Sequence, residues 1–344
     1  MTSPRVRFAA IGLNHDHIYG QIRTLVEAGA DCVAAYAAEP ALAAEFARRL
    51  PDIHLAATPS EIFEDDSIEL VATAAIASER AAIALEAMRR GKDVYSDKPG
   101  CTSLTQLNEV RRVQAETGRI YSIGFGEHFG SRATVRAGEL VQAGAIGRVV
   151  QTATFGPHRA RVASRPAWFF CKEQYGGILT DIGSHQVEQF LFFTGSSQAE
   201  VASAHVGNFR YPEYPELEDY GDMTVRGDRG MGSLRADWYT PDGLPVWGDG
   251  RLFVLGTEGY LEVRKNVDLA GRDGGEHLFF VDARGVQYID TQHLDLPFGR
   301  QLLADVRDRT ATALPQSRCF LAMQLALEGE AAAVRIGPAM ATSH

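Results

Sequence analysis

Three residues of this sequence combine a reactive side chain with surroundings typical of a ligand site. Asp181 and His185 are four residues apart, so a helix would place both side chains on one face. Gly176 and Gly177 precede them and would let the backbone approach a ligand closely. Lys98 follows a predicted strand. Histidine accepts protons near neutral pH, and lysine can do so where burial lowers its pKa. Histidine and lysine are therefore both able to serve as a base toward a bound ligand.

Each of the three also has a purely structural interpretation when taken alone. Lys98 could be an exposed loop lysine, and His185 could be a core histidine. Asp181 could be an acid near a helix N-terminus, where the helix dipole favours negative charge. The functional interpretation depends on the three residues occurring together.

A second group of candidate ligand-binding residues lies in the turn after the first predicted strand. Residues 12–17 read GLNHDH. In dinucleotide-binding folds, a glycine-rich turn at this point brings the pyrophosphate onto the N-terminus of the next helix. Here Asn14 replaces the second glycine and His17 the third, and asparagine tolerates left-handed backbone angles. The turn fits a dinucleotide site, although other α/β proteins begin in a similar way.

The elements that would position these residues alternate between strand and helix up to Gly124. Apolar runs predict strands over residues 6–11, 31–37, 54–57, 69–75, 92–96 and 119–124. Helical spacing predicts helices over residues 18–28, 40–50, 59–64, 78–90 and 103–117. This order predicts a Rossmann-type, doubly wound parallel sheet with helices on both faces. We assign residues 1–124 to a dinucleotide-binding domain.

Residues 125–344 show a different pattern, in which long strand-like stretches dominate. Helices are expected near residues 133–143, 180–194 and 319–333, with about eight strands among them. This pattern predicts an α+β domain for substrate binding and oligomerisation, built on a large, mostly antiparallel sheet. The outer face of such a sheet needs a cover, so we expect a homodimer or homotetramer formed through it.

Three motifs give the chain a family resemblance over essentially its whole length. Residues 87–94 read AMRRGKDV and lead to residues 95–100, YSDKPG. Residues 176–185 read GGILTDIGSH, and residues 256–259 read GTEG. The sequence thus resembles the Gfo/Idh/MocA oxidoreductases, which include glucose–fructose oxidoreductase and inositol dehydrogenase. That family carries Glu-Lys-Pro where this chain has Asp97 before its lysine, a conservative departure.

The resemblance implies hydride transfer between a nicotinamide cofactor and a sugar, cyclitol or sugar-derived hydroxyl or ketone. It implies that His185 and Lys98 share the proton transfer, and we favour His185 as acceptor and Lys98 as the group that polarises the oxygen. The reverse assignment stays open, and Asp181 would hold the sugar or orient the site. The residues assigned to the cofactor are Gly12, Leu13, Asn14, His15, His17, Glu39, Ala75, Asp97 and Lys98. The further residues assigned to the substrate are His128, Arg165 and Trp168.

Cofactor preference and reaction type have alternatives. Glu39 is the first carboxylate after the second strand, and no arginine replaces it, which slightly favours NAD over NADP. Some members of the resembling family recycle bound NAD to drive elimination, isomerisation or glycoside cleavage. Others are sensors without enzymatic activity, and these tend to lose the catalytic residues that are present here.

Composition excludes several classes of function. The formal charge of −10 argues against nucleic-acid binding. No apolar run is long enough for a membrane helix, and the N-terminal apolar run is too short for a signal peptide. The four cysteines lie far apart, which is typical of a reducing cytoplasm. We expect no metal, because His15 and His17 lack a third ligand nearby in the sequence.

Overall fold

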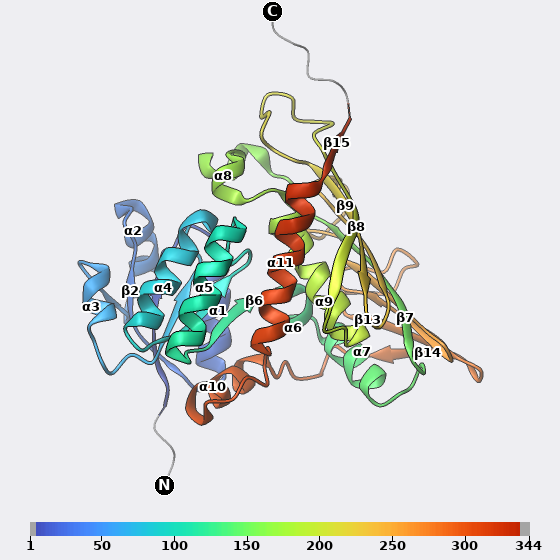
Figure 1. Ribbon diagram of the computed structural model, residues 1–344, viewed down its shortest axis with the longest axis horizontal. Helices are drawn as coiled ribbons and strands as arrows, with labels where there is room; N and C mark the ends of the chain where they lie inside the picture. Colours follow the sequence, from blue (N-terminus) through green and yellow to red (C-terminus); the bar gives the residue numbers. More distant parts are fainter. Residues whose placement is uncertain (1–4, 338–344) are drawn as a thin grey trace, which may run out of the picture. The chain divides into compact units, whose positions relative to one another are not determined.

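A computed structural model describes residues 5–337 of the chain, which divides into two compact units (Figure 1). One unit comprises Met1–Gly124 with Pro297–Phe320, and the other comprises Phe125–Leu296 with Leu321–His344. The first division falls at Gly124, where the predicted strand–helix alternation ends. The sequence placed Pro297–Phe320 in the second domain, whereas the structure places it with the first unit.

The first unit is built on a six-stranded sheet in the order β3-β2-β1-β4-β5-β6, and every neighbouring pair is parallel. This confirms the predicted doubly wound sheet. The chain moves outward from β1 to β3 and then returns to β4, so the direction of winding reverses between β1 and β4. The strands are β1 (Arg7–Ile11), β2 (Asp31–Tyr36), β3 (His54–Leu55), β4 (Leu70–Thr73), β5 (Asp93–Asp97) and β6 (Tyr121–Gly124).

Helices connect these strands and pack on the sheet, and α4 and α5 lie side by side (Figure 1). The helices are α1 (His17–Glu27), α2 (Pro40–Arg49), α3 (Pro59–Phe63), α4 (Arg80–Arg89), α5 (Leu104–Thr117) and α10 (Phe298–Asp308). Helix α10 was not predicted. It packs against α1 at Gly299, where an added Cβ would lie 2.7 Å from the carbonyl oxygen of Thr24.

The second unit is built on a nine-stranded sheet in the order β14-β13-β12-β11-β7-β10-β9-β8-β15. Its pairs are antiparallel except for β7 with β10 and β8 with β15, which confirms a mostly antiparallel sheet. The strands are β7 (Val149–Pro157), β8 (Ala199–Gly207), β9 (Tyr220–Gly227), β10 (Met231–Asp237), β11 (Arg251–Gly256), β12 (Gly259–Arg264), β13 (His277–Asp282), β14 (Gly285–Asp290) and β15 (Val334–Ile336).

Helices α7 (Arg132–Gln142) and α9 (Ser184–Thr194) cover one face of this sheet (Figure 1). The core between α7 and the sheet contains Ala133 and Ala137 from the helix and Val254, Leu261 and Leu278 from the strands. The other helices whose residues belong to this unit are α6 (Gly126–Phe129), α8 (Lys172–Tyr175) and the later part of α11 (Gln316–Ala332).

Two further observations bear on the setting of the protein. Within residues 5–337, no helix combines the length and the apolar character that crossing a bilayer requires. Cys32, Cys101, Cys171 and Cys319 are all free thiols, so no disulfide contributes to the fold of this described part.

Candidate active site

The turn between β1 and α1 is fixed by the strands on either side of β1. The N–H of Gly12 donates to the carbonyl of Tyr36 (3.0 Å), and the N–H of His15 donates to that of Ala74 (2.9 Å). Gly12 has φ +78°, and a Cβ there would lie 2.4 Å from Cβ of Ala75. Glycine is therefore required at this position both by its backbone angle and by the close approach of Ala75.

Asn14 and Glu39, predicted separately as cofactor residues, are hydrogen-bonded to each other. The Asn14 Nδ2 donates to Glu39 Oε1 at 2.7 Å. Glu39 directly precedes α2, close to the carboxyl end of β2, where Rossmann folds place the acid that binds a ribose hydroxyl. Leu13, also predicted as a cofactor residue, has its side chain in the core. The turn thus presents polar groups from Asn14 onward and buries Leu13.

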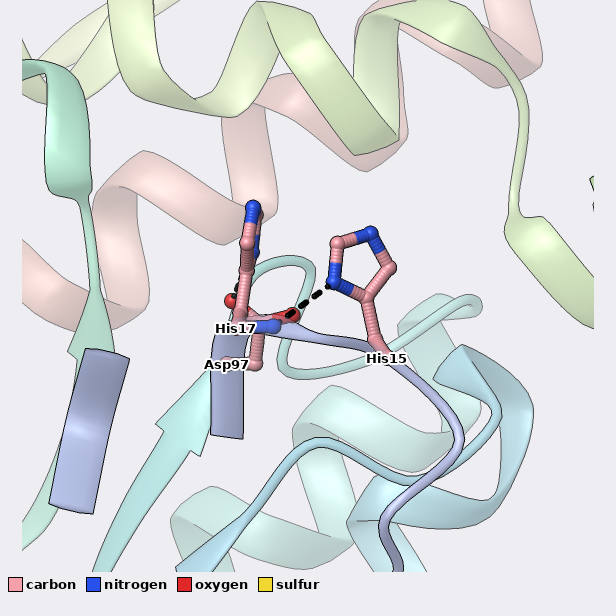
Figure 2. Close-up of side chains that lie close together, drawn as sticks. All are labelled: His15, His17 and Asp97. Carbon is pink, nitrogen blue, oxygen red and sulfur yellow. Dashed lines mark hydrogen bonds and ion pairs between the residues drawn. The ribbon is translucent and has the colours of Figure 1, made fainter. Parts of the chain in front are cut away.

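Asp97, the last residue of β5, is buried and lies next to the imidazole rings of His15 and His17 (Figure 2). Its Oδ1 lies 2.9 Å from His17 Nδ1, and its Oδ2 lies 3.1 Å from Nη2 of Arg80. Burial acts to raise the pKa of Asp97, but His17 and Arg80 outweigh it and hold that pKa well below its usual range. Asp97 is therefore a carboxylate at neutral pH.

Arg80, which the sequence analysis missed, ties this cluster to Lys98. The guanidinium is 1% exposed and donates to the carbonyls of Ala75 (2.8 Å), Lys98 (2.5 Å) and Pro99 (3.1 Å). Lys98 is itself buried. An arginine at the start of an alanine-rich helix looks like an ordinary surface residue, and nothing in its local sequence signals this role.

His15 and His17 lie side by side in the turn, with ring centroids 3.9 Å apart (Figure 2). The His15 Nδ1 accepts a hydrogen bond from the backbone N–H of His17 at 3.1 Å. Burial, followed by the nearby His17 and Lys98, lowers the pKa of His15 well below its ordinary value. His15 is therefore a neutral imidazole at neutral pH.

In the second unit, the predicted helix that carries Asp181 and His185 is present, with one irregularity. A π-helical segment, Leu179–Gly183, leads directly into α9. Asp181 lies within this wider turn and His185 lies in the first turn of α9, and both are buried. π-Helical turns occur frequently at functional sites.

The glycine pair before this segment approaches a protein carboxylate. Gly177 has φ +91°, and a Cβ there would lie 2.2 Å from Cδ of Glu330. The N–H of Leu179 donates to Glu330 (2.9 Å), and the N–H of Ile178 donates to Glu218 (3.0 Å). Two acids thus hold the start of the π-helical segment. The close approach expected for a ligand is made here by Glu330.

Lys172 neutralises part of the charge of these two acids. Its Nζ lies 2.5 Å from Glu218 Oε1 and 2.7 Å from Glu330 Oε1. Burial, reinforced by the negative charge of Glu218, raises the pKa of Glu330 to about 8, while Lys172 opposes the shift. Glu330 therefore keeps its proton to higher pH than an exposed glutamate does.

Glu127, another residue that the sequence analysis did not assign, is a partly buried carboxylate beside α9. Its Oε2 accepts from Gln186 Nε2 (3.0 Å) and from Lys265 Nζ (2.9 Å). Lys265 also donates to Gln189 Oε1 at 2.9 Å. Burial acts to raise the pKa of Glu127, but Lys265 and then His185 outweigh it and lower that pKa to about 2. His185 therefore lies in the electrostatic field of a carboxylate.

Comparison with known proteins identifies the family. Residues 6–125 match the oxidoreductase family with an NAD-binding Rossmann fold, and residues 134–262 match the GFO/IDH/MocA C-terminal domain. A crystal structure of a candidate oxidoreductase from Erwinia carotovora atroseptica SCRI1043 is 45% identical, with a TM-score of 0.94. The match covers 96% of this chain and 100% of that one. The chain belongs to the GFO/IDH/MocA family.

Other relatives show what members similar to this chain act on. A scyllo-inositol 2-dehydrogenase (NAD(+)) of Bacillus subtilis is 27% identical over 83% of this chain and 79% of its own length. A D-xylose dehydrogenase of Paenarthrobacter nicotinovorans is 27% identical over 52% of this chain and 50% of its own. Levoglucosan dehydrogenase in complex with NADH and levoglucosan shares the fold, with a TM-score of 0.75 at 20% identity over 96% of each chain.

His128, which the sequence predicts as a substrate residue of this GFO/IDH/MocA protein, is buried among protein side chains. Its Nδ1 lies 2.8 Å from Oε2 of the fully buried Glu188. The ring packs against Phe129 and Phe192, with centroid distances of 4.8 Å and 4.2 Å. These contacts favour a structural role for His128.

The other two predicted substrate residues of this GFO/IDH/MocA protein lie in an aromatic cluster. The guanidinium of Arg165 lies over the rings of Phe169 (4.2 Å) and Trp238 (5.0 Å), and Trp168 stacks edge-on with Phe169 (6.3 Å). Burial lowers the pKa of Arg165, while the charge of Asp181 raises it. Arg165 is therefore near Asp181, and its stacking on aromatic rings holds it in place.

Proposed function

We propose that this GFO/IDH/MocA protein is an NAD(P)-dependent dehydrogenase that oxidises a hydroxyl group of a sugar or cyclitol, or reduces the corresponding ketone. The observation that carries the proposal is the buried Lys98, positioned through Arg80 beside Asp97 at the carboxyl end of a parallel strand. Ligands of doubly wound sheets bind at that end. The scyllo-inositol and D-xylose dehydrogenases among its relatives support the substrate class.

The residues of the first turn fit a dinucleotide. The strand order places the turn at the point where winding reverses, which is the usual place for such a ligand. Gly12 keeps the turn tight, and the Glu39 carboxylate, bound to Asn14, would accept hydrogen bonds from ribose hydroxyls. The same carboxylate would repel a 2′-phosphate, so we propose NAD as the preferred cofactor. The nicotinamide, when bound, supplies the hydride acceptor.

The side chains of Lys98, Asp181 and His185 would provide the remaining chemistry. We propose that His185 accepts the hydroxyl proton and that the Glu127 carboxylate favours its protonated form. Lys98 would polarise the substrate oxygen, and Asp181 would accept a hydrogen bond from a neighbouring hydroxyl. Substrate contacts by Arg165 and Trp168 would complete the site.

The test measures turnover with NAD and a substrate panel that includes scyllo-inositol, D-xylose and levoglucosan. Turnover is monitored through the absorbance of the reduced nicotinamide. We expect Lys98→Met and His185→Ala each to lower kcat about 100-fold or more, because each removes a group engaged in proton transfer. NADH binding, measured by its fluorescence, should remain in both variants. The control His293→Ala changes an exposed histidine and should retain full activity.

Three outcomes would contradict parts of this proposal. Near-normal turnover of either variant would remove that residue from the mechanism. Sugar product formed without accumulation of reduced cofactor would show recycling of the cofactor instead of net oxidation. Tight dinucleotide binding with no turnover across the panel would favour a sensor.

We also propose that a second copy of the chain covers the open face of the nine-stranded sheet. Helices α7 and α9 occupy one face, while large apolar side chains are exposed elsewhere on its strands. These exposed residues are Val150, Leu255, Tyr260, Val286 and Tyr288. Exposed apolar groups of this kind mark association surfaces. Light scattering should give a dimer or tetramer, and a monomer at micromolar concentration would refute the proposal.

A further inference from the structure

The turn that would receive the dinucleotide also brings together a set of metal-ligating side chains. His15, His17 and Asp97 each offer one ligand atom, and these three atoms all lie within 4.8 Å of one another. Figure 2 shows the two imidazole rings next to the Asp97 carboxylate. No other group of three or more histidine, cysteine or acidic residues meets this spacing in the part of the chain between residues 5 and 337.

The donor set suits a particular class of ion. Two imidazole nitrogens and one carboxylate oxygen are ligands that zinc and neighbouring divalent transition metals accept, whereas magnesium and calcium prefer oxygen alone. Zinc bonds of about 2.0–2.2 Å place two ligands of a tetrahedral ion about 3.4 Å apart. The His17 Nδ1 and Asp97 Oδ1 are already 2.9 Å apart, and the side chain of His17 is half-exposed and able to turn.

The surrounding contacts orient these ligands. Arg80 binds Oδ2 of Asp97, which leaves Oδ1 facing the histidines. The His15 Nδ1 accepts the backbone N–H of His17 at 3.1 Å, so coordination of a metal through this nitrogen would replace that hydrogen bond. The N–H of His15 is anchored on Ala74. Contacts of this kind around the ligands are what orient them in established metal sites.

We propose that His15, His17 and Asp97 bind one divalent transition-metal ion of the zinc class when the dinucleotide is absent. Three protein ligands would leave one coordination position open. The charge of Arg80 offsets that of Asp97, so we expect micromolar affinity, weaker than that of structural zinc. Since two of the ligands belong to the turn assigned to the pyrophosphate, zinc should compete with the dinucleotide. This last step rests on the proposed function.

The first experiment measures metal binding alone, on the full chain freed of metal by a chelator and of dinucleotide by exhaustive dialysis. Titration calorimetry with zinc chloride should show one ion per chain. His15→Ala and His17→Ala should each weaken binding tenfold or more. Cobalt(II) in place of zinc should give a visible absorption band of low-coordinate cobalt in the wild type, which both variants lose. This band is independent of any effect of the substitutions on activity.

Matched controls use histidines outside the cluster. His54, exposed and 3.5 Å from Glu61, is a histidine–carboxylate pair on the same unit without a second imidazole. His54→Ala and His293→Ala should leave zinc affinity unchanged. Absence of binding at micromolar zinc, or equal binding by His15→Ala, His17→Ala and the wild type, would overturn the proposed site.

The second experiment adds NADH, with its fluorescence as the readout. We expect zinc to raise the apparent Kd for NADH in proportion to its concentration in the wild type, and much less in His17→Ala. Zinc that leaves NADH binding unchanged, or strengthens it, would refute competition. If NADH does not bind at all while the metal binds as expected, the proposed cofactor function fails and the metal site stands.

Discussion

The two units hold their buried acids in different ways, and the difference follows from how each sheet is built. In the first unit, Asp97 meets Arg80 and His17 at the carboxyl edge of a parallel sheet. Asp97 ends β5, while Arg80 and His17 are the first residues of the helices α4 and α1 that follow β4 and β1. In the second unit, Glu127 is paired with Lys265, which lies 138 residues away and just after β12. The first arrangement follows from the order of elements, and the second depends on tertiary packing.

The largest expected effect comes from removing the cation that pairs with each of these acids, Arg80 beside Asp97 and Lys265 beside Glu127. Arg80→Met would leave the Asp97 carboxylate, whose side chain is 4% exposed, without its buried guanidinium partner. Breaking a buried pair in this way costs about 3–5 kcal/mol. Lys265→Met should cost less, because Glu127 keeps its bond from Gln186 and its side chain is 14% exposed. Calorimetry that resolves the unfolding of the two units checks the order, and a larger loss for Lys265→Met would contradict it.

Each unit contains a glycine with positive φ whose Cβ position is occupied by a neighbouring residue. Gly12→Ala and Gly177→Ala each force an alanine to a positive φ and to within 2.4 Å and 2.2 Å of a neighbouring atom, respectively. The backbone strain and the overpacking together should lower the free energy of unfolding by about 2–4 kcal/mol. Gly91→Ala is the matched control, because Gly91 has φ +76° but no atom near its Cβ position. It should cost only about 1 kcal/mol. Equal losses in all three, measured by thermal unfolding, would show that the close contacts are unimportant.

Much of the first unit could be predicted because a parallel sheet orders its strands simply. Short apolar runs and helical spacing were enough to locate β1 to β6, Gly12 and Lys98. The pattern of α10, with Phe298, Leu302 and Val306 buried, is helical, but nothing in it indicates that it returns to pack on α1. Long-range packing of this kind depends on surfaces that form only in the fold.

The candidate site shows the same limit at the level of single residues. His15 and His17 lack a third ligand in the sequence because Asp97 is 80 residues beyond His17 and reaches it only through the pairing of strands. Arg80 and Glu127 carry no local signal, since their roles arise from carbonyls and side chains that the fold brings to them. Motif spacing therefore singled out the candidate residues, while the groups that surround them could be found only in the structure.

The acids of the second unit predict how stability varies with pH. Glu330 has its pKa raised from 4.5 in the unfolded chain to about 8, because it is buried beside Glu218. The folded state thus binds more protons than the unfolded state between these values. This contribution to stability is complete below pH 4.5 and is lost as pH rises through 8, by at most about 1.4 kcal/mol per pH unit. Glu330→Gln should flatten that slope in thermal unfolding. Glu213→Gln, at an exposed site, should not change it, and an unchanged slope in Glu330→Gln would contradict the assignment.

The smallest expected effect is a pH shift that tests whether Glu127 and Lys265 tune His185 electrostatically or only support the structure around it. The Glu127 carboxylate favours the protonated form of His185, and the Lys265 ammonium beside it opposes this. Glu127→Gln should therefore move the acidic limb of the kcat/KM profile for hydroxyl oxidation to lower pH, by up to about one unit. Lys265→Met removes a positive charge and should move the same limb to higher pH. A purely structural defect would lower the rate but would not move the acidic limb in opposite directions in the two variants. The sign of the two shifts therefore distinguishes electrostatic tuning from structural support. Shifts in the same direction, or none, would mean that Glu127 and Lys265 only support the packing of α9.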